Sequence, residues 1–174
     1  MNGSSRPTWD RACKLLGTHD GEASELFIID LPSSHLARVV DRIARLPGLK
    51  VSADGEGALV DPEVFSEVWR DRICAIPVVE SYYSLISAYG TSEHLQIYLF
   101  IGPPSEPLEV EFVFWNDLTF PPSIPDRERT RRLDRLVDLA EDCRRGAPGA
   151  RCILSSEHNA DPRELLSCSH ALVW

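Results

Sequence analysis

The sequence predicts an α+β protein, a single domain in which helices pack on one face of a mostly antiparallel sheet. The chain has 174 residues, a common size for one domain, and no repeat or long linker divides it. Short apolar stretches of strand length follow one another in its middle part, separated by turn residues. Consecutive strands of this kind favour antiparallel pairing, and several segments with the apolar period of a helix supply the second layer.

The chain opens with a short helix, a strand and a second helix. Residues 1–7 are expected to be frayed, and residues 8–16 to form a short helix. Residues 26–31 are an almost continuous apolar run, which predicts a buried strand. Ser33 or Ser34 can then cap a helix, because a serine hydroxyl accepts a bond from a free N–H of the first turn. The inner face of that helix carries Leu36, Val39, Val40 and Ile43.

The next segment predicts a hairpin, a helix and a strand. Residues 49–53 and 58–60 form two short strands around a turn in which Gly55 and Gly57 supply positive φ angles. Asp61 and Pro62 mark the start of a helix, because an acidic cap followed by proline suits the first turn. Residues 78–88 are rich in β-branched and aromatic side chains and are predicted to be a strand.

Two further strands, 94–101 and 108–115, are joined by a stiff loop with three prolines. Side chains alternate between the two faces of a strand, so the second strand has one apolar face and one mixed face. The apolar face carries Leu108, Val110, Phe112 and Phe114. The mixed face carries Glu109, Glu111, Val113 and Trp115.

The last third contains the longest helix, residues 123–145, which Pro125 begins and Gly146 ends. Its inner stripe consists of Leu133, Leu136, Val137, Ala140 and Cys143. A strand at 151–155, a short helix opened by Asp161 and Pro162, and a strand within 169–174 at the edge of the sheet complete the fold.

Composition indicates a cytoplasmic protein. The apolar runs are far shorter than the roughly 18 residues that a membrane-spanning helix needs, and the first residues lack the pattern of a signal peptide. Five widely spaced cysteines indicate reduced thiols rather than a disulfide framework. We therefore expect no membrane partner.

The negative charge is concentrated in the centre of the chain. Residues 51–125 contain 12 acidic and two basic residues, whereas the whole chain has a net charge of −9. A surface built from this stretch would repel nucleic acid and attract a basic partner. The other interpretation is a solvated surface that keeps the protein in solution.

The binding interpretation gives the leading hypothesis, a non-enzymatic acidic protein that occludes a basic protein partner. Its concrete form is an immunity protein or inhibitor of a bacterial toxin. Glu109 and Glu111 lie two residues apart on one strand, so they face the same way, beside Trp115. Carboxylates around an exposed aromatic ring suit arginine and lysine. The predicted partner-binding residues are Glu80, Glu93, Glu109, Glu111, Trp115 and Asp117.

Catalytic and metal-binding patterns are weaker. Glu109 and Glu111 could act as general acid and base, but this chemistry needs a cleft that the sequence does not supply. Cys168 and His170, two apart on a predicted strand, resemble half a zinc site without a second close pair. The pairs Cys168–His170 and Cys152–His158 could also form an activated thiol, but sequence proximity is poor evidence for one. We therefore assign no metal, cofactor or catalytic residue.

Phosphate and nucleic-acid sites are also disfavoured. The Gly55–Gly57 turn is too short for a phosphate-binding loop, and its Glu56 would repel phosphate. The one basic cluster, on the predicted long helix, alternates with acids and is typical of a solvated, ion-paired helix face. Its arginines are Arg127, Arg129, Arg131, Arg132 and Arg135.

An alternative function remains from a different class, an α+β domain that binds or converts a small molecule in an aromatic pocket. Tyrosines suit such a pocket because each has an apolar ring and a polar tip. The candidate lining residues are Tyr82, Tyr83, Tyr89, Tyr98, Trp115 and Phe120.

Overall fold

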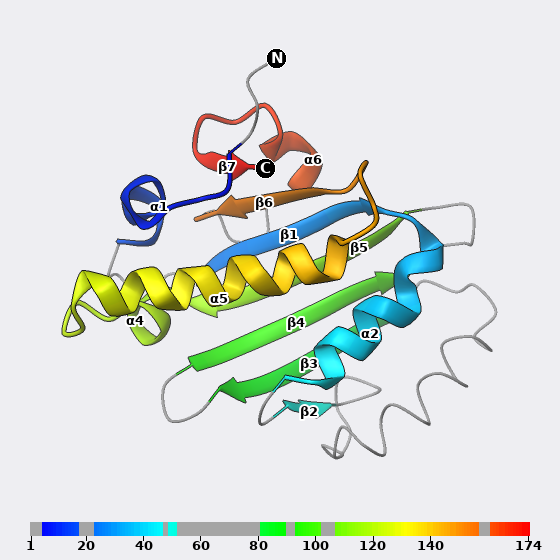
Figure 1. Ribbon diagram of the computed structural model, residues 1–174, viewed down its shortest axis with the longest axis horizontal. Helices are drawn as coiled ribbons and strands as arrows, with labels where there is room; N and C mark the ends of the chain where they lie inside the picture. The colour runs from blue at the N-terminus through cyan, green and yellow to red at the C-terminus, as the bar shows by residue number, and fades with distance from the viewer. Residues whose placement is uncertain are drawn as a thin grey trace.

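The protein has a mixed α+β fold with a layer of helices against an antiparallel sheet (Figure 1). The computed structural model describes residues 5–17, 23–46, 49–51, 81–89, 93–101, 107–156 and 161–174, with only the backbone of the strands between 49 and 101. The helices are α1 (Trp9–Leu16), α2 (Leu36–Ala44), α4 (Asn116–Thr119), α5 (Asp126–Arg144) and α6 (Pro162–Leu165), with a 3₁₀ turn η1 (Ser33–His35). The strands are β1 (Ala23–Leu31), β2 (Leu49–Val51), β3 (Ser81–Tyr89), β4 (Glu93–Ile101), β5 (Leu108–Trp115), β6 (Arg151–Ser155) and β7 (Ala171–Val173).

Seven strands form one sheet in the order β2-β3-β4-β5-β1-β6-β7. Every pairing between neighbours is antiparallel. Strands β3, β4 and β5 follow one another along the chain and in space, whereas β1 lies between β5 and β6. The predicted α+β class, with its consecutive strands pairing antiparallel, is confirmed.

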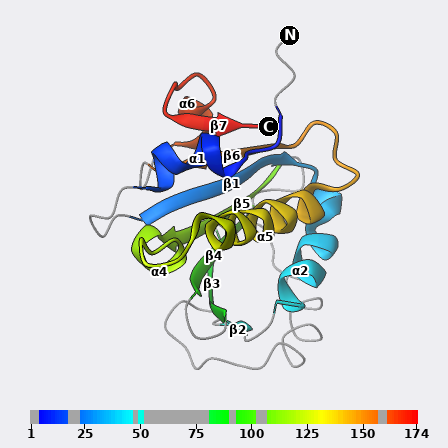
Figure 2. The same ribbon diagram turned by 60° about the vertical axis from the view of Figure 1, so that its left-hand side comes forward.

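The main core lies between one face of the sheet and helices α1, α2 and α5 (Figure 1, Figure 2). The apolar face predicted for residues 108–115 points into this core, where Phe112 and Phe114 are at most 1% exposed. The inner stripe of α5 meets it from the other side, and Leu133, Val137 and Cys143 are buried there. Phe120 also lies in this core, with its ring 5.2 Å from that of Trp9 and 5.9 Å from that of Phe114.

The short helix α6 lies on the opposite face of the sheet, so helices do not all pack on one side. Leu165 of α6 packs in a second, smaller core with Phe27, Ile29 and Ile153. These three strand residues alternate with Leu26, Ile28 and Cys152, which belong to the main core. Both faces of β1 and β6 are therefore covered, which explains why β1 is an almost continuous apolar run.

Several local predictions are confirmed. Asp161 caps α6 by accepting a 2.8 Å bond from the backbone N–H of Arg163, with Pro162 in the first turn. Strand β7 lies at the edge of the sheet, and Gly146 follows α5 with a φ of 86°. The expected fraying of residues 1–7 is wrong for Arg6 and Pro7, because Pro7 is buried and Arg6 lies 2.8 Å from the carboxylate of Asp138.

Other local predictions differ from the structure. Ser33 and Ser34 form η1, and α2 begins after His35 with no side-chain cap. Strand β2 pairs with β3. The predicted turn at Gly55–Gly57, the strand at 58–60 and the helix start at Asp61 lie outside the described residues. Helix α5 begins only after Pro125, because residues 121–125 form a separate turn whose carbonyls bond to Arg129.

The packing of Phe112 gives a test of the main core. Phe112 stands opposite Leu26 in β1 and Ile97 in β4, in the middle of the sheet. Phe112→Ala should reduce the free energy of unfolding by about 3–5 kcal/mol, because it leaves a cavity in a close-packed interior. Leu118→Ala is the control, since Leu118 is 42% exposed, and should change stability by about 0.5 kcal/mol or less. Chemical denaturation measures both, and equal losses would contradict this description of the core.

Candidate functional site

The candidate site lies on the face of the sheet opposite the main core. Glu109, Glu111 and Trp115 alternate along β5 with core residues, as the sequence predicts, and all three are half-buried. In the backbone register Glu111 stands opposite Phe27 in β1 and Tyr98 in β4. The two glutamates therefore lie over the centre of the sheet rather than on its rim.

A third carboxyl group, from Glu25 of β1, completes a cluster that the sequence analysis missed. Glu25 is fully buried and stands opposite Val113, two register pairs from Glu111 and on the same face of the sheet. The two side chains are hydrogen-bonded to each other. Such a bond between carboxyl groups requires a proton, so the pair holds one proton between two acids. We call Glu25, Glu109 and Glu111 the carboxyl cluster.

The surroundings of Glu111 raise its pKa far above the usual range of a glutamate, so it keeps its proton to a higher pH. Burial is the largest cause, followed by the charge of Glu25, the hydrogen bond to Glu25 and the charge of Glu109, and together they raise the pKa of Glu111 to about 8. At neutral pH Glu111 is therefore mostly uncharged. The formal charge of the strand overstates the negative potential that this face presents.

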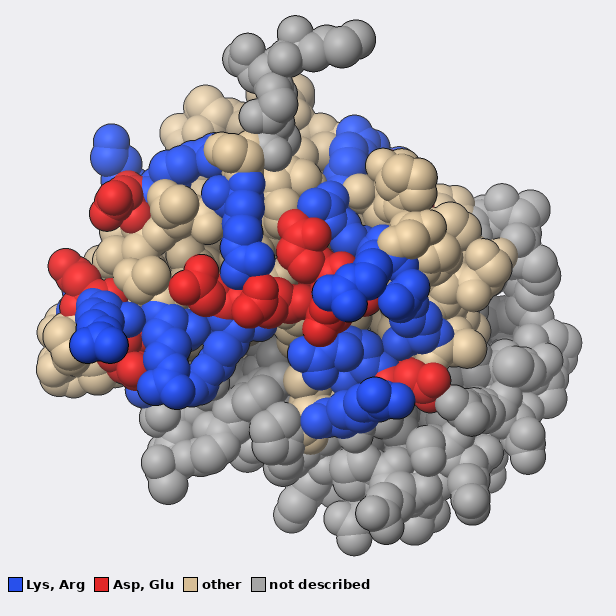
Figure 3. All heavy atoms as spheres, in the orientation of Figure 1, with Lys and Arg blue, Asp and Glu red and all other residues tan. Residues whose placement is uncertain are grey.

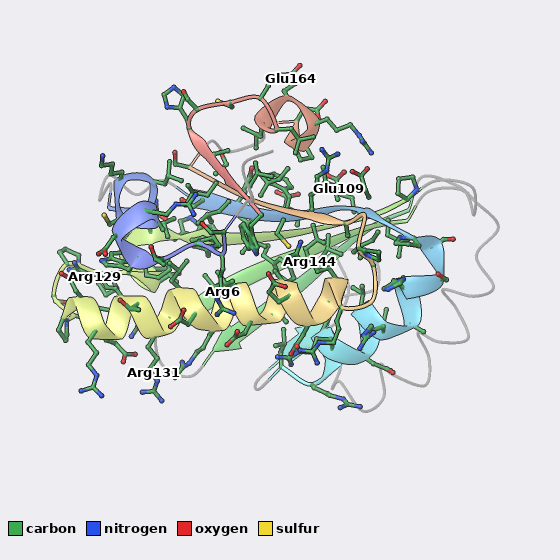
Figure 4. All side chains as sticks on the ribbon, turned by 45° about the horizontal axis from the view of Figure 1, so that its top comes forward. Arg6, Glu109, Arg129, Arg131, Arg144 and Glu164 are labelled. Atoms are coloured by element: carbon green, nitrogen blue, oxygen red, sulfur yellow. The ribbon has the colours of Figure 1, made fainter. Side chains whose placement is uncertain are left out.

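Glu109 lies at the end of the carboxyl cluster near a group of ion pairs (Figure 4). Burial raises the pKa of Glu109, the charge of Arg163 opposes that change, and Asp161 and Asp30 add to it. Asp30 itself is bonded by Arg151 at 2.5 Å and by Arg163 at 3.2 Å. Burial disfavours the charge of Asp30, but the two arginines outweigh burial and lower its pKa.

The backbone at Asp30 is unusual as well. Asp30 has a φ of 60°, a left-handed conformation that aspartate tolerates better than most residues. The register of β1 against β5 shifts between Ile28 and Leu31, so this residue marks an irregularity in the strand. At this irregularity the Asp30 carboxylate contacts Arg151 of β6 and Arg163 of α6, and so links the sheet to that helix.

The remaining predicted partner-binding residues are not drawn together by the described structure. Asp117 is exposed in α4, just past the end of β5. Glu93 begins β4, whose described part is its backbone, and Glu80 lies outside the described residues. Of the predicted partner-binding residues, the structure therefore places three on one face: Glu109, Glu111 and Trp115. Trp115 is half-buried rather than fully exposed.

The cysteines that the structure describes show no sign of an activated thiol or a metal centre. Burial raises the pKa of both Cys143 and Cys152 to about 12, which keeps these thiols protonated. Cys168 and His170 lie in the turn before β7, not on a strand, so the predicted common orientation is wrong. His158 lies outside the described residues. Within the described part of the chain, no group of three or more possible ligands gathers in a way that could hold a metal ion.

Phe120 does not belong to the predicted aromatic pocket. Phe120 packs in the main core with Phe114, whereas Trp115 alternates to the opposite face of β5. The two rings therefore cannot line one pocket. The side chains of Tyr82, Tyr83, Tyr89 and Tyr98 lie outside the described structure.

The arginines of α5 form the ion-paired helix face that the sequence predicts. Arg129 lies 2.8 Å from Asp126, and Arg132 lies 3.4 Å from Glu128. Arg132 also donates a 2.9 Å bond to the carbonyl of Thr119, which holds α4 against α5. These arginines fix the helix layer in place.

Comparisons with family models, with curated proteins and with solved structures give no match for this chain. No described helix is both long enough and apolar enough to cross a membrane.

The carboxyl cluster predicts a specific pH dependence of stability. The unfolded chain loses the Glu111 proton near pH 4.5 and the folded chain near pH 8, so the folded state binds more protons between these values and stability falls as the pH rises. Glu111→Gln removes this titration while keeping a donor toward Glu25. The variant should gain about 2–4 °C in Tm over the native protein at pH 8.5, about 1 kcal/mol after allowing for partial exposure, and little at pH 4.5.

Thermal unfolding from pH 4.5 to 9 measures this difference. Glu164→Gln, which neutralises an exposed glutamate on α6, is the matched control and should shift the curve equally at all pH values. Parallel curves for Glu111→Gln and the native protein would show that Glu111 titrates as an ordinary surface acid.

Proposed function

We propose that this chain is a non-enzymatic binding protein that occludes a basic protein partner, as an inhibitor or immunity protein against a toxin would. In this proposal, an arginine or lysine side chain of the partner binds at the carboxyl cluster. The observation that carries the proposal is that three carboxyl groups crowd on one sheet face, and that burial and the two neighbouring acids make Glu111 hold its proton, with no described cation acting against them at Glu111.

A cation from a partner would relieve this crowding. Its charge favours the ionised form of Glu111, so the proton shared with Glu25 would be released when the partner binds. Trp115 on the same face offers an aromatic surface against which a guanidinium can pack. The interaction combines desolvated charge with an aromatic anchor, the usual composition of an interface hot spot.

The mechanism is occlusion. Glu109 and Glu111 are half-buried and so partly accessible, and an inhibitor of a basic active site needs complementary charge and shape rather than catalytic groups of its own. Asp117, exposed in α4 past the end of β5, is a supporting charge in this proposal. In this proposal Glu80 and Glu93 remain supporting residues.

The experiment begins with affinity capture on the purified chain from native cytosol, washed in parallel at low and high salt. A retained basic protein is then purified and titrated back by calorimetry at pH 7 in two buffers of different ionisation enthalpy. We expect binding that weakens with salt and releases close to one proton for each complex, because Glu111 ionises as the partner enters.

Two variants separate the carboxyl cluster from general acidity. Glu109→Gln with Glu111→Gln should weaken binding at least tenfold and abolish proton release, since both changes remove the acceptors for the cation. Glu164→Gln removes one exposed charge and should change affinity less than twofold. A captured partner that binds the double variant as tightly as the native chain would exclude this surface, and an empty capture at both salt concentrations would overturn the proposal of a strong partner.

A further inference from the structure

A hollow of about 380 Å³ lies at the C-terminal end of α5, far along the helix from α4. It is lined by Glu141, Arg144, Arg145, Gly146, Ala147 and Pro148. Its volume is within the range of sites that hold small molecules.

The floor of the hollow is a tight turn. Arg145 has φ −56° and ψ 123°, Gly146 has φ 86°, and the N–H of Ala147 donates a 2.9 Å bond to the carbonyl of Arg144. These angles define a type II turn, which requires glycine at its third position. A Cβ at Gly146 would lie at ordinary contact distance, 3.4 Å, from a guanidinium nitrogen of Arg38, so the positive φ rather than lack of space requires glycine here.

Positive charge gathers around this end of α5. Arg38 and Arg42 of α2 reach the residues around Arg144 and Arg145, since Arg38 bonds to the carbonyl of Arg145 and Arg42 bonds to the carboxylate of Asp142. Figure 3 shows basic side chains mixed with acidic ones on this face of the molecule. The acids in the same region are Asp41, Glu141 and Asp142, so these four basic residues exceed the acidic ones by one. In a chain with net charge −9, this is a local reversal of sign.

Two of these arginines bond to carbonyls close to the hollow. Arg38 donates a 2.6 Å bond to the carbonyl of Arg145, just past the end of α5, and Arg144 donates to the carbonyls of Ala150 and Trp174 at 3.3 and 3.1 Å. Both arginines place positive charge near the negative end of the α5 dipole. Glu141, the acid in the hollow, accepts bonds of 2.8 Å from both Arg144 and the indole N–H of Trp174. Arg144 therefore offsets the negative charge of this carboxylate.

Arg145 differs from these two. Its side chain is 67% exposed, and its guanidinium contacts the carboxylate of Asp142 through one nitrogen. Asp142 also accepts a 3.0 Å bond from Arg42, so its charge is divided between two arginines. A guanidinium has five N–H donors, and those of Arg145 that Asp142 does not use are available at the edge of the hollow.

We propose that this hollow binds the oxyanion group of a small molecule, a phosphate or a carboxylate, with Arg145 as its direct contact. Asp142 holds the guanidinium in position, and Arg38, Arg42 and Arg144 supply the surrounding positive potential. Arginine suits this task because its planar fork of donors matches two oxygens of either group. The site has the opposite charge preference from the carboxyl cluster and does not rest on the proposed function.

The test titrates the full chain with inorganic phosphate and, separately, with acetate, each against sodium chloride at equal ionic strength. The amide signals of Gly146 and Gly149 in ¹⁵N NMR spectra report binding. We expect saturable shifts with a Kd in the low millimolar range for at least one anion. Saturation by phosphate alone identifies a phosphorylated ligand, and saturation by acetate identifies a carboxylate ligand.

The variants decide whether Arg145 is the contact. Arg145→Gln should weaken anion binding at least fivefold. Arg145→Lys keeps the positive charge but loses the planar pair of guanidinium donors, so it should weaken binding by an intermediate amount. This second variant replaces the first as the test if Arg145→Gln does not fold. Arg127→Gln is the matched control, because Arg127 is exposed at the other end of the same helix, about 27 Å away, and should bind like the native chain. Shifts that follow chloride as well as either anion, or equal losses in Arg145→Gln and Arg127→Gln, would overturn the proposal.

Discussion

The pairing of β1 with β5 on one side and β6 on the other is the interaction on which the rest of the structure depends. It places β1 inside the sheet, so its alternating residues face two different cores. Leu26 and Ile28 meet the helix layer, whereas Phe27 and Ile29 meet α6. A strand covered on both faces must be apolar almost throughout, and any polar residue within it is carried into the interior.

Glu25 is the acidic residue that becomes buried because β1 is covered on both faces. It lies on the same face as Phe27 and is fully buried, which would be costly for an isolated carboxylate. The hydrogen bond to Glu111 and the shared proton reduce that cost by keeping one negative charge fewer in the cluster. A hydrophobic residue at either position would fill the same space without any shared proton. Features that break local rules in this way occur mostly at functional sites, which is why the carboxyl cluster carries the functional proposal.

The elements that the sequence predicts well are those with a strong local period. The alternation in β5 identifies which residues enter the core, and the stripe of α5 identifies its inner face, because each pattern reports burial directly. The capping of α6 by Asp161 is equally local. In contrast, the position of β1 between β5 and β6 is a long-range property that no neighbouring residues encode, and the placement of α6 on the second face follows from it.

The same distinction explains the candidate site. Strand alternation is sufficient to place Glu109, Glu111 and Trp115 on one face. Glu25 is separated from Glu111 by 86 positions in the chain, and the two meet only through strand register. The sequence signal that could have raised the question is a glutamate directly before an apolar run, but such a residue more often marks the end of a strand. Likewise, the expected serine cap of α2 is absent because Ser33 and Ser34 form η1 and His35 takes the N-cap position.

Charge counted along the sequence and charge presented in space differ for a physical reason. Residues 51–125 contain an excess of ten acids, and this count treats Glu111 as ionised, whereas burial and its neighbours keep it mostly protonated at neutral pH. The carboxyl cluster therefore contributes less to long-range attraction than its composition indicates. In the proposed interaction, an arriving cation would restore the ionisation of Glu111 and so meet a negative charge that was absent before contact. Such a site would select its partner at short range, and long-range attraction would come from exposed acids such as Asp117.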